Sequence, residues 1–243
     1  KACGEAGHET ECKKVSKGKT YYGKGNTNQG ILQLLAENNI PLVIRMVGAV
    51  SESGLYKTGT WAAANAGLID GLTDYDSNDY GGSVGDNGHM ARMKSAKDVT
   101  IEGVGTDAAM DGWGIHFMSE TSTTAAGLGK SFEVRNLTFM NQPEDAIGME
   151  GVQDGSVITA PVERCWIHNN EFYSPSITGP AESDKAEGDG SCDFKRGEYL
   201  TVSYNYFEGC HKTNLVGSSD TSLQYNLTYH HNIWKGCAAR QPL

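Results

Sequence analysis

Short apolar segments recur along the chain, separated by stretches rich in Gly, Ser, Thr and Asp. Segments of this kind, bounded by turn-forming residues, are typical of β-strands. We expect strands at 42–47, 98–104, 131–139, 163–173, 199–207 and 226–234. One helix is predicted before them, over 31–39, where apolar residues have helical spacing and the pattern ends before Pro41. No strong helix signal separates the strands, so the pattern predicts an all-β architecture.

Three asparagines stand in the same place in three of these segments. Asn170, Asn205 and Asn232 each end an apolar run and are followed two residues later by an aromatic residue. Their separations of 35 and 27 residues are too long for hairpins and suit coils of a right-handed parallel β-helix, stacked about 4.8 Å apart. Stacked amides could then form a buried asparagine ladder. The alternative is that these asparagines only mark turns.

Composition limits the classes of protein to consider. The chain has 243 residues and a formal net charge of −10, and we interpret it as a single domain over 1–243. The negative charge argues against a nucleic-acid partner. No run of 18 apolar residues predicts a membrane span. The start, Lys1-Ala-Cys-Gly4, lacks a positive-then-apolar leader, so we expect any signal peptide to have been removed.

The even number of cysteines, without a Cys-x-x-Cys pattern, favours disulfides and a secreted protein over buried thiols, which remain the alternative. The six are Cys3, Cys12, Cys165, Cys192, Cys210 and Cys237. Cys210 and Cys237 each follow a ladder asparagine by five residues, so their Cα atoms should lie about 5 Å apart on neighbouring coils. We predict a disulfide between them. Proximity suggests a second bridge, Cys3–Cys12, and elimination leaves Cys165–Cys192.

Three aspartates are candidates for a metal site. Asp189 and Asp193 would lie about 13 Å apart in a straight strand, but Gly190 and Ser191 between them favour a bend. Asp145 belongs to an earlier coil, which stacking could bring close. Three converging carboxylates suit Ca²⁺, which takes oxygen ligands at about 2.3–2.6 Å. The alternative is that they are turn aspartates in Gly-rich loops.

The C-terminal half carries a combination of motifs that resembles a known family. They are Thr201-Val-Ser-Tyr-Asn-Tyr206, Gly217-Ser-Ser-Asp220, Thr228-Tyr-His-His-Asn232 and Ala239-Arg-Gln-Pro242. Over about 131–243 the chain resembles the pectate lyases of polysaccharide lyase family 1. The resemblance implies a secreted parallel β-helix that cleaves polygalacturonate by calcium-dependent β-elimination.

The resemblance also implies roles for five residues. Asp145, Asp189 and Asp193 fall at the positions that bind the catalytic calcium. Lys212 falls at the position of a substrate-binding lysine, and Arg240 at that of the catalytic arginine, which acts as the base. That role is demanding, because arginine has a pKa above 12 unless nearby cations in a desolvated cleft lower it.

Three departures from the family pattern affect these expectations. Trp166-Ile-His-Asn169 stands where many relatives have Trp-Ile-Asp-His, which changes the polar contacts of that strand. Pro143 stands where some relatives have a further calcium-binding aspartate. The family continues past Arg-x-Pro with more coils, whereas this sequence stops at Leu243, so we expect a truncated β-helix.

Other functions remain open. Pectin lyases lack the calcium carboxylates, and polygalacturonases need paired acids and do not explain Lys212 with Arg240. A non-catalytic polysaccharide-binding β-helix is the third alternative. His230 and His231 are expected to stack or to form hydrogen bonds within the coil. His116 and His211 have no carboxylate partner at a readable spacing.

Overall fold

The computed structural model describes residues 14–16, 19–21, 41–51, 90–119, 129–142, 145–173 and 189–242. Regular structure in these residues is entirely β-strand. The strands are β1 (Lys14–Ser16), β2 (Lys19–Tyr21), β3 (Leu42–Ser51), β4 (Met90–Lys94), β5 (Lys97–Asp111), β6 (Gly114–Met118), β7 (Lys130–Arg135), β8 (Thr138–Met140), β9 (Ile147–Glu150), β10 (Val152–Asp154), β11 (Val157–Ala160), β12 (Val162–His168), β13 (Glu171–Tyr173), β14 (Cys192–Lys195), β15 (Gly197–Ser203), β16 (Tyr206–Glu208), β17 (Gln224–His230) and β18 (Ile233–Lys235).

The predicted helix over 31–39 lies outside the described residues. Within the described ranges no helix is long and apolar enough to cross a membrane.

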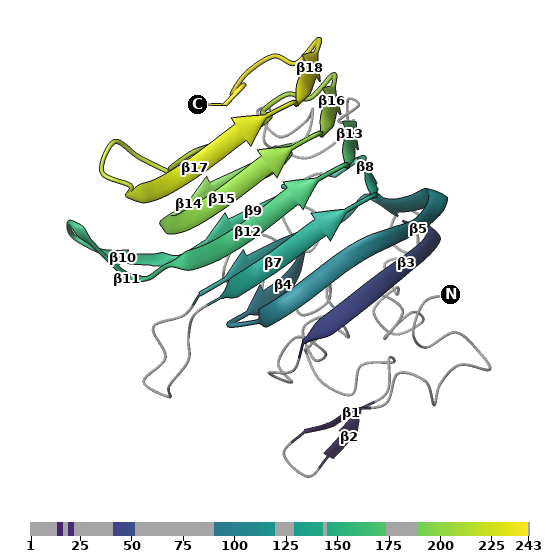
Figure 1. The fold of residues 1–243 in the computed structure, drawn as a ribbon, viewed down its shortest axis with the longest axis horizontal. Helices are drawn as coiled ribbons and strands as arrows, with labels where there is room; N and C mark the ends of the chain where they lie inside the picture. Colours follow the sequence, from purple (N-terminus) through teal and green to yellow (C-terminus); the bar gives the residue numbers. More distant parts are fainter. Residues whose placement is uncertain are drawn as a thin grey trace, which may run out of the picture.

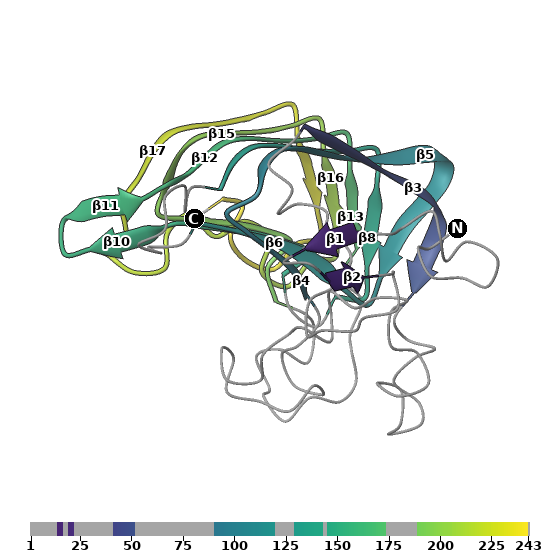
Figure 2. The ribbon, with the colours of Figure 1, turned by 90° about the horizontal axis from the view of Figure 1, so that it is seen from below.

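The chain winds into a right-handed parallel β-helix. Strands far apart in the sequence lie side by side, in the order β17-β15-β12-β7-β5, and a separate four-stranded sheet has the order β14-β9-β6-β4 (Figure 1). β8, β13, β16 and β18 form a third row, which joins the first because the long strand β5 bends and pairs with both β7 and β8. Figure 2, seen from below, shows the coils enclosing a common interior. The predicted fold class is therefore confirmed.

Each predicted strand segment after 130 contains two strands with a sharp corner between them. The corner residue has a left-handed backbone, with φ of 54° at Asn136 and Asn169, 56° at Tyr204 and 55° at His231. Asparagine and histidine tolerate this conformation better than most residues with side chains, whereas Tyr204 adopts it at a cost of about 1 kcal/mol. The same corner recurs on these four successive coils, so it turns this part of the stack from one row of strands to the next.

The residue after each of the last three corners forms the predicted asparagine ladder. The Oδ1 atom of Asn205 accepts hydrogen bonds from the backbone N–H of Asn170 at 3.0 Å and from its side-chain amide at 3.2 Å. Asn232 repeats both contacts to Asn205, at 3.0 and 3.1 Å. Asn170 in turn accepts from the N–H of Leu137 at 3.1 Å. Asn170 and Asn205 are buried. The ladder is confirmed, and it satisfies the backbone groups that the corner removes from the sheet.

The aromatic residues two positions after the ladder stack as well. Ring centroids are 5.0 Å apart for Phe139 and Phe172, 4.7 Å for Phe172 and Phe207, and 5.7 Å for Phe207 and Trp234. The planes are inclined by 6°, 10° and 5°. This apolar column lies beside the amide column and fills the interior at this corner.

The predicted disulfides do not form among the described cysteines. Cys165, Cys192, Cys210 and Cys237 are free thiols, so the Cys210–Cys237 and Cys165–Cys192 predictions are wrong, and Cys3 and Cys12 lie outside the described residues. Cys210 and Cys237 do occupy equivalent places. Each directs its thiol to a carbonyl of the preceding coil, Phe172 and Phe207 respectively, at 3.5 Å. The two thiols also contact each other without forming a disulfide bond.

The ladder gives the first testable prediction. Replacing Asn205 by Ala removes two hydrogen bonds to Asn170 and the bond that its amide donates to the carbonyl of Ile167. Because buried donors are left unpaired, the free energy of unfolding should fall by about 2–4 kcal/mol in chemical denaturation. Thr201→Ala, on the outer face of the same coil, is the control and should stay within about 0.5 kcal/mol. Equal effects of the two substitutions would contradict a structural role for the ladder.

Candidate functional site

The sequence-predicted site residues gather on the face formed by β4, β6, β9 and β14. We did not predict these strands, because they have only four or five residues and include glycines and charged residues. Single parallel bridges extend the face to later coils, from Gly190 to Lys212 and from Lys212 to Ala239. Four successive coils therefore bring together side chains that lie up to 95 residues apart in the sequence, from Asp145 to Arg240.

Asp145 and Asp193 converge on Gly190. Oδ1 of Asp145 accepts a hydrogen bond from the N–H of Gly190 at 3.0 Å, and Oδ1 of Asp193 accepts one from the N–H of Leu215 at 2.9 Å. A Cβ atom on Gly190 would lie 2.4 Å from Oδ1 of Asp193 and 2.6 Å from Oδ1 of Asp145. Only glycine leaves this space free, so both carboxylates can face the same point beside the backbone.

Both carboxylates are buried, and this changes their protonation. Burial raises the pKa of Asp193 well above its usual range, and the charge of Asp145 adds to that shift. Burial also raises the pKa of Asp145, and Asp189 raises it further, while Lys195 and His116 act in the opposite direction. Two buried carboxylates this close cannot both ionise without positive charge nearby. The pair is suited to a hard cation with oxygen ligands.

The two predicted basic residues face this pair from the later coils. Nζ of Lys212 lies 3.0 Å from Oδ1 of Asp189. Nη1 of Arg240 lies 3.7 Å from Oδ2 of Asp193, and a quarter of the arginine side chain is exposed. The backbone fixes Arg240, since its carbonyl accepts a 2.7 Å hydrogen bond from the N–H of Asn214. Both cations thus contact a carboxylate of the site.

The three aspartates do not form one closed set of ligands. Among the described residues, no group of three or more His, Cys, Asp and Glu side chains is close enough to hold a metal ion. Asp145 and Asp193 lie together, whereas Asp189 contacts Lys212. The donors still fit a calcium ion, because the two converging side chains supply buried anionic oxygens. Asp189 directly precedes Gly190 and would add a third oxygen if it released Lys212.

Lys195 is a charged group of the site that we did not predict. It follows Asp193 by two residues in β14 and therefore lies on the same side of the strand. Burial by itself would lower the pKa of Lys195, but Asp145, Asp193, Glu150 and Asp189 raise it overall. Lys195 therefore carries a permanent positive charge beside the carboxylates. The i, i+2 spacing from Asp193 was the signal that could have identified it.

A cluster of charged residues around Glu150 lies next to Lys195. It includes His116, for which we predicted no carboxylate partner from the sequence spacing. His116 has a carboxylate partner: its Nε2 lies 3.5 Å from Oε2 of Glu150. Arg196 also forms an ion pair with Glu150, and it donates a 3.1 Å hydrogen bond to Ser218. Burial alone would raise the pKa of Glu150, but the contact with His116 and the charges of His116, Lys195 and Arg196 lower it to about 2. Sequence spacing gave no sign of this pairing because the partners are 34 to 46 residues apart.

Comparison with known proteins identifies one family. The family model described as pectate lyase matches residues 57–243. Pectate lyase 2 of Pectobacterium carotovorum is 32% identical over 151 residues, which are 60% of this chain and 36% of that protein. A pectate trisaccharide-lyase of Bacillus licheniformis is 33% identical over 153 residues, 62% of this chain and 39% of that protein. The chain thus spans well under half the length of these curated relatives.

Solved structures of similar fold are also pectate lyases. One, from Bacillus sp. N165 in complex with trigalacturonate, is 25% identical, covers 91% of this chain and 53% of that chain, and has a TM-score of 0.54. Another is pectate lyase C from Erwinia chrysanthemi, determined at pH 9.5 with 30 mM Ca²⁺. It is 21% identical, covers 84% of this chain and 59% of that chain, and has a TM-score of 0.51.

The low pKa of Glu150 gives the second prediction. A carboxyl whose pKa falls from 4.5 to about 2 on folding stabilises the protein above pH 4.5 and loses that contribution as the pH drops toward 2. Glu150→Gln should therefore cost about 3 kcal/mol of unfolding free energy near pH 7 and progressively less below pH 4.5. Urea denaturation at several pH values measures the difference. Glu198→Gln on the outer sheet is the control, and a pH-independent cost for Glu150→Gln would refute the ion pair.

Proposed function

Because this chain belongs to the pectate lyase family, we propose that it catalyses the calcium-dependent β-elimination of α-1,4-linked galacturonan. The observation that supports this most is the pair of buried carboxylates, Asp145 and Asp193, at a glycine, with Lys212 and Arg240 on the following coils. An acidic pair alone would suit many cation sites. The two adjoining bases add the means to hold and deprotonate an anionic sugar.

The reaction defines what the site has to supply. A proton leaves C5 of a galacturonate unit, its electron pair forms the C4–C5 double bond, and the C4–O bond breaks, leaving the departing oxygen to take up a proton. The C6 carboxylate next to C5 makes that proton poorly acidic while its charge is not offset. Groups that bind this carboxylate more strongly as charge develops lower the barrier.

Each site residue has a place in this scheme. Asp145, Asp189 and Asp193 would hold the calcium, which when bound withdraws charge from the substrate carboxylate. Lys212 would bind a substrate carboxylate in place of Asp189. Arg240 would lie at C5 and take the proton. Lys195 would offset the charge of Asp145 and Asp193 and keep both side chains in place while metal and substrate exchange.

The substrate and location follow from the same assignment. The substrate is polygalacturonate, the acidic plant cell-wall polymer, and binding of trigalacturonate by the relative from Bacillus sp. N165 supports this choice. An acidic chain with net charge −10 would repel such a polymer, and a bound cation together with the basic residues of the site offsets that repulsion. An extracellular enzyme is the form that can reach this polymer, so we assign the protein to the secreted class.

The third prediction tests Arg240. Polygalacturonate incubated with the protein and calcium should give a rise in ultraviolet absorbance from the unsaturated product, and a chelator should stop it. Arg240→Ala should lower kcat by a factor of about 100 to 1,000, because a group acting on the reacting atoms is lost. Arg164→Ala, an exposed arginine of another sheet, is the matched control and should retain full activity.

Other outcomes of this assay favour the alternatives. New reducing ends without ultraviolet absorbance would indicate hydrolysis, as by a polygalacturonase. Elimination restricted to methyl-esterified polymer and insensitive to chelator would indicate a pectin lyase. Binding without either product would favour a non-catalytic β-helix. Near-normal elimination by Arg240→Ala would remove that residue from the mechanism.

The fourth prediction tests the metal ligands. Asp193→Ala and Asp189→Ala should raise the calcium concentration needed for half-maximal elimination by about tenfold or more, since each removes an anionic oxygen. Excess calcium should restore part of the activity, which it cannot do for Arg240→Ala. Direct calorimetric titration with calcium measures the same loss without substrate. Unchanged calcium affinity in both variants would refute the site.

A further inference from the structure

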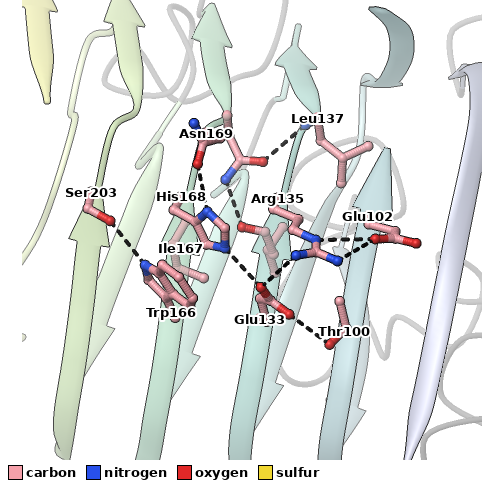
Figure 3. Close-up of polar contacts among 12 residues, drawn as sticks. Thr100, Glu102, Glu133, Arg135, Leu137, Trp166, Ile167, His168, Asn169 and Ser203 are labelled. Carbon is pink, nitrogen blue, oxygen red and sulfur yellow. Dashed lines mark hydrogen bonds and ion pairs between the residues drawn. The ribbon is translucent and has the colours of Figure 1, made fainter. Parts of the chain in front are cut away.

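The outer face of β5, β7, β12 and β15 carries a hydrogen-bonded polar network beneath an exposed tryptophan. Figure 3 shows this network, which runs from Glu102 through Arg135, Glu133 and His168 to Trp166. These side chains belong to the ten-stranded sheet, whereas Asp193 lies in the four-stranded sheet. The network is therefore separate from the proposed catalytic site and is not explained by it.

Trp166 is fixed although it is 45% exposed. Its ring stacks on the imidazole of His168 with centroids 3.8 Å apart and planes inclined by 20°. Its indole N–H donates a 3.0 Å hydrogen bond to Oγ of Ser203 on the next coil (Figure 3). One face of the ring is thus supported from below. A large aromatic held rigidly at the surface loses little conformational entropy when a ligand stacks on it.

His168 is fixed in turn. Its Nδ1 lies 2.7 Å from Oδ1 of Asn169, and its Nε2 lies 3.0 Å from Oε1 of Glu133. Glu133 also accepts hydrogen bonds from Arg135 at 3.2 Å and from Thr100 at 3.0 Å. Such a supporting layer is a feature of binding sites whose contact groups are held in place by a second set of residues.

A second exposed aromatic lies one coil further on, at the corner directly after β15. Tyr204 is 53% exposed and stacks on His231, with centroids 4.8 Å apart and planes inclined by 17°. Thr201 pairs in register with Trp166, is partly exposed and bears a hydroxyl group three residues before Tyr204. Trp166, Thr201 and Tyr204 are called the aromatic platform below.

The charges on this face are paired with one another. Arg45 lies 2.8 Å from Glu102, Arg135 lies 2.7 Å from Glu102, and Arg164 lies 3.7 Å from Glu163. The three arginines of the face are therefore already matched by carboxylates. The face suits an uncharged ligand better than a polyanion, which would have to displace these carboxylates.

We propose that the aromatic platform is a second, non-catalytic binding surface for an uncharged polysaccharide chain, such as a methyl-esterified stretch of pectin. The apolar C–H faces of two sugar rings stack on Trp166 and Tyr204, and a sugar hydroxyl bonds to Thr201, which is partly exposed, while the buried Ser203 holds the indole in place. This binding needs neither the metal nor the bases of the other sheet.

Affinity electrophoresis in gels containing highly methyl-esterified pectin, run with a chelator, tests the proposal on the whole chain. The wild-type protein should be retarded, and Trp166→Ala should weaken the apparent affinity by about tenfold, as expected for a central aromatic contact. Trp166→Phe keeps the ring and should retain most of the retardation. A thermal melt shows whether Trp166→Ala is folded. If it is not, the Phe variant is used to test the proposal instead.

A tyrosine pair provides the matched control. Tyr204→Ala should weaken retardation. Tyr199→Ala should not, although Tyr199 lies in β15, which Tyr204 directly follows, is 51% exposed and has a similar φ of 60°. The two Trp166 variants, Tyr204→Ala and Tyr199→Ala should all cleave short oligogalacturonates at the wild-type rate. This control distinguishes an error in the binding proposal from an error in the catalytic proposal. No retardation of the wild-type protein, equal retardation of Trp166→Ala, or stronger binding to polygalacturonate than to esterified pectin would overturn the proposal.

Discussion

Parallel hydrogen bonding holds neighbouring coils one strand spacing apart, so each residue lies beside its counterpart on the next coil. The interior must therefore be filled by columns of matching side chains, and a shift of one residue would turn every inward side chain outward. Asn170 and Asn205 make such a shift costly, because their buried amides bond to the neighbouring ladder asparagine and to backbone groups of the preceding coil. The aromatic column alone would fix the register less strictly, because ring packing depends less on direction than hydrogen bonding between amides does. Its members are Phe172, Phe207 and Trp234.

The same register builds the candidate site from the chain's most distant parts. Asp145, Gly190, Lys212 and Ala239 occupy successive coils at the same place on one face, joined by backbone hydrogen bonds and bridges. The three aspartates lie on the two earlier coils, with Lys195 beside them, and Lys212 and Arg240 lie on the two later coils. Burial strengthens the interactions among these charges, because buried groups are little screened by water or salt. The raised pKa values of Asp145 and Asp193 are a direct consequence of that burial.

The elements that could be predicted from the sequence are those with a local signature. The outer strands have long apolar runs, and the ladder asparagines and their aromatics repeat, so register could be inferred before any contact was known. β4, β6, β9 and β14 were missed because glycines such as Gly148 and charges such as Lys195 interrupt their pattern, and these are the residues that line the site. The side-chain contacts of the site could not be predicted from the sequence, for a different reason. The contact of Lys212 with Asp189 and the direction of the Cys210 thiol depend on side-chain rotamers, which stacking permits but does not determine.

Each coil of the β-helix has several outward faces around one core. Two binding sites can therefore lie on different faces and have only the core in common. Residues alternate between inside and outside along each strand, so Ile167 contributes to the core while its neighbours Trp166 and His168 contribute to the outer face. The aromatic platform and the carboxylate pair are thus built on the same stack without sharing a side chain. If both bind the same polymer, in its esterified and its charged stretches, attachment at one raises the local concentration of chain at the other. A rigid stack suits this arrangement, because it fixes the separation of the two surfaces and leaves the polymer to supply the flexibility.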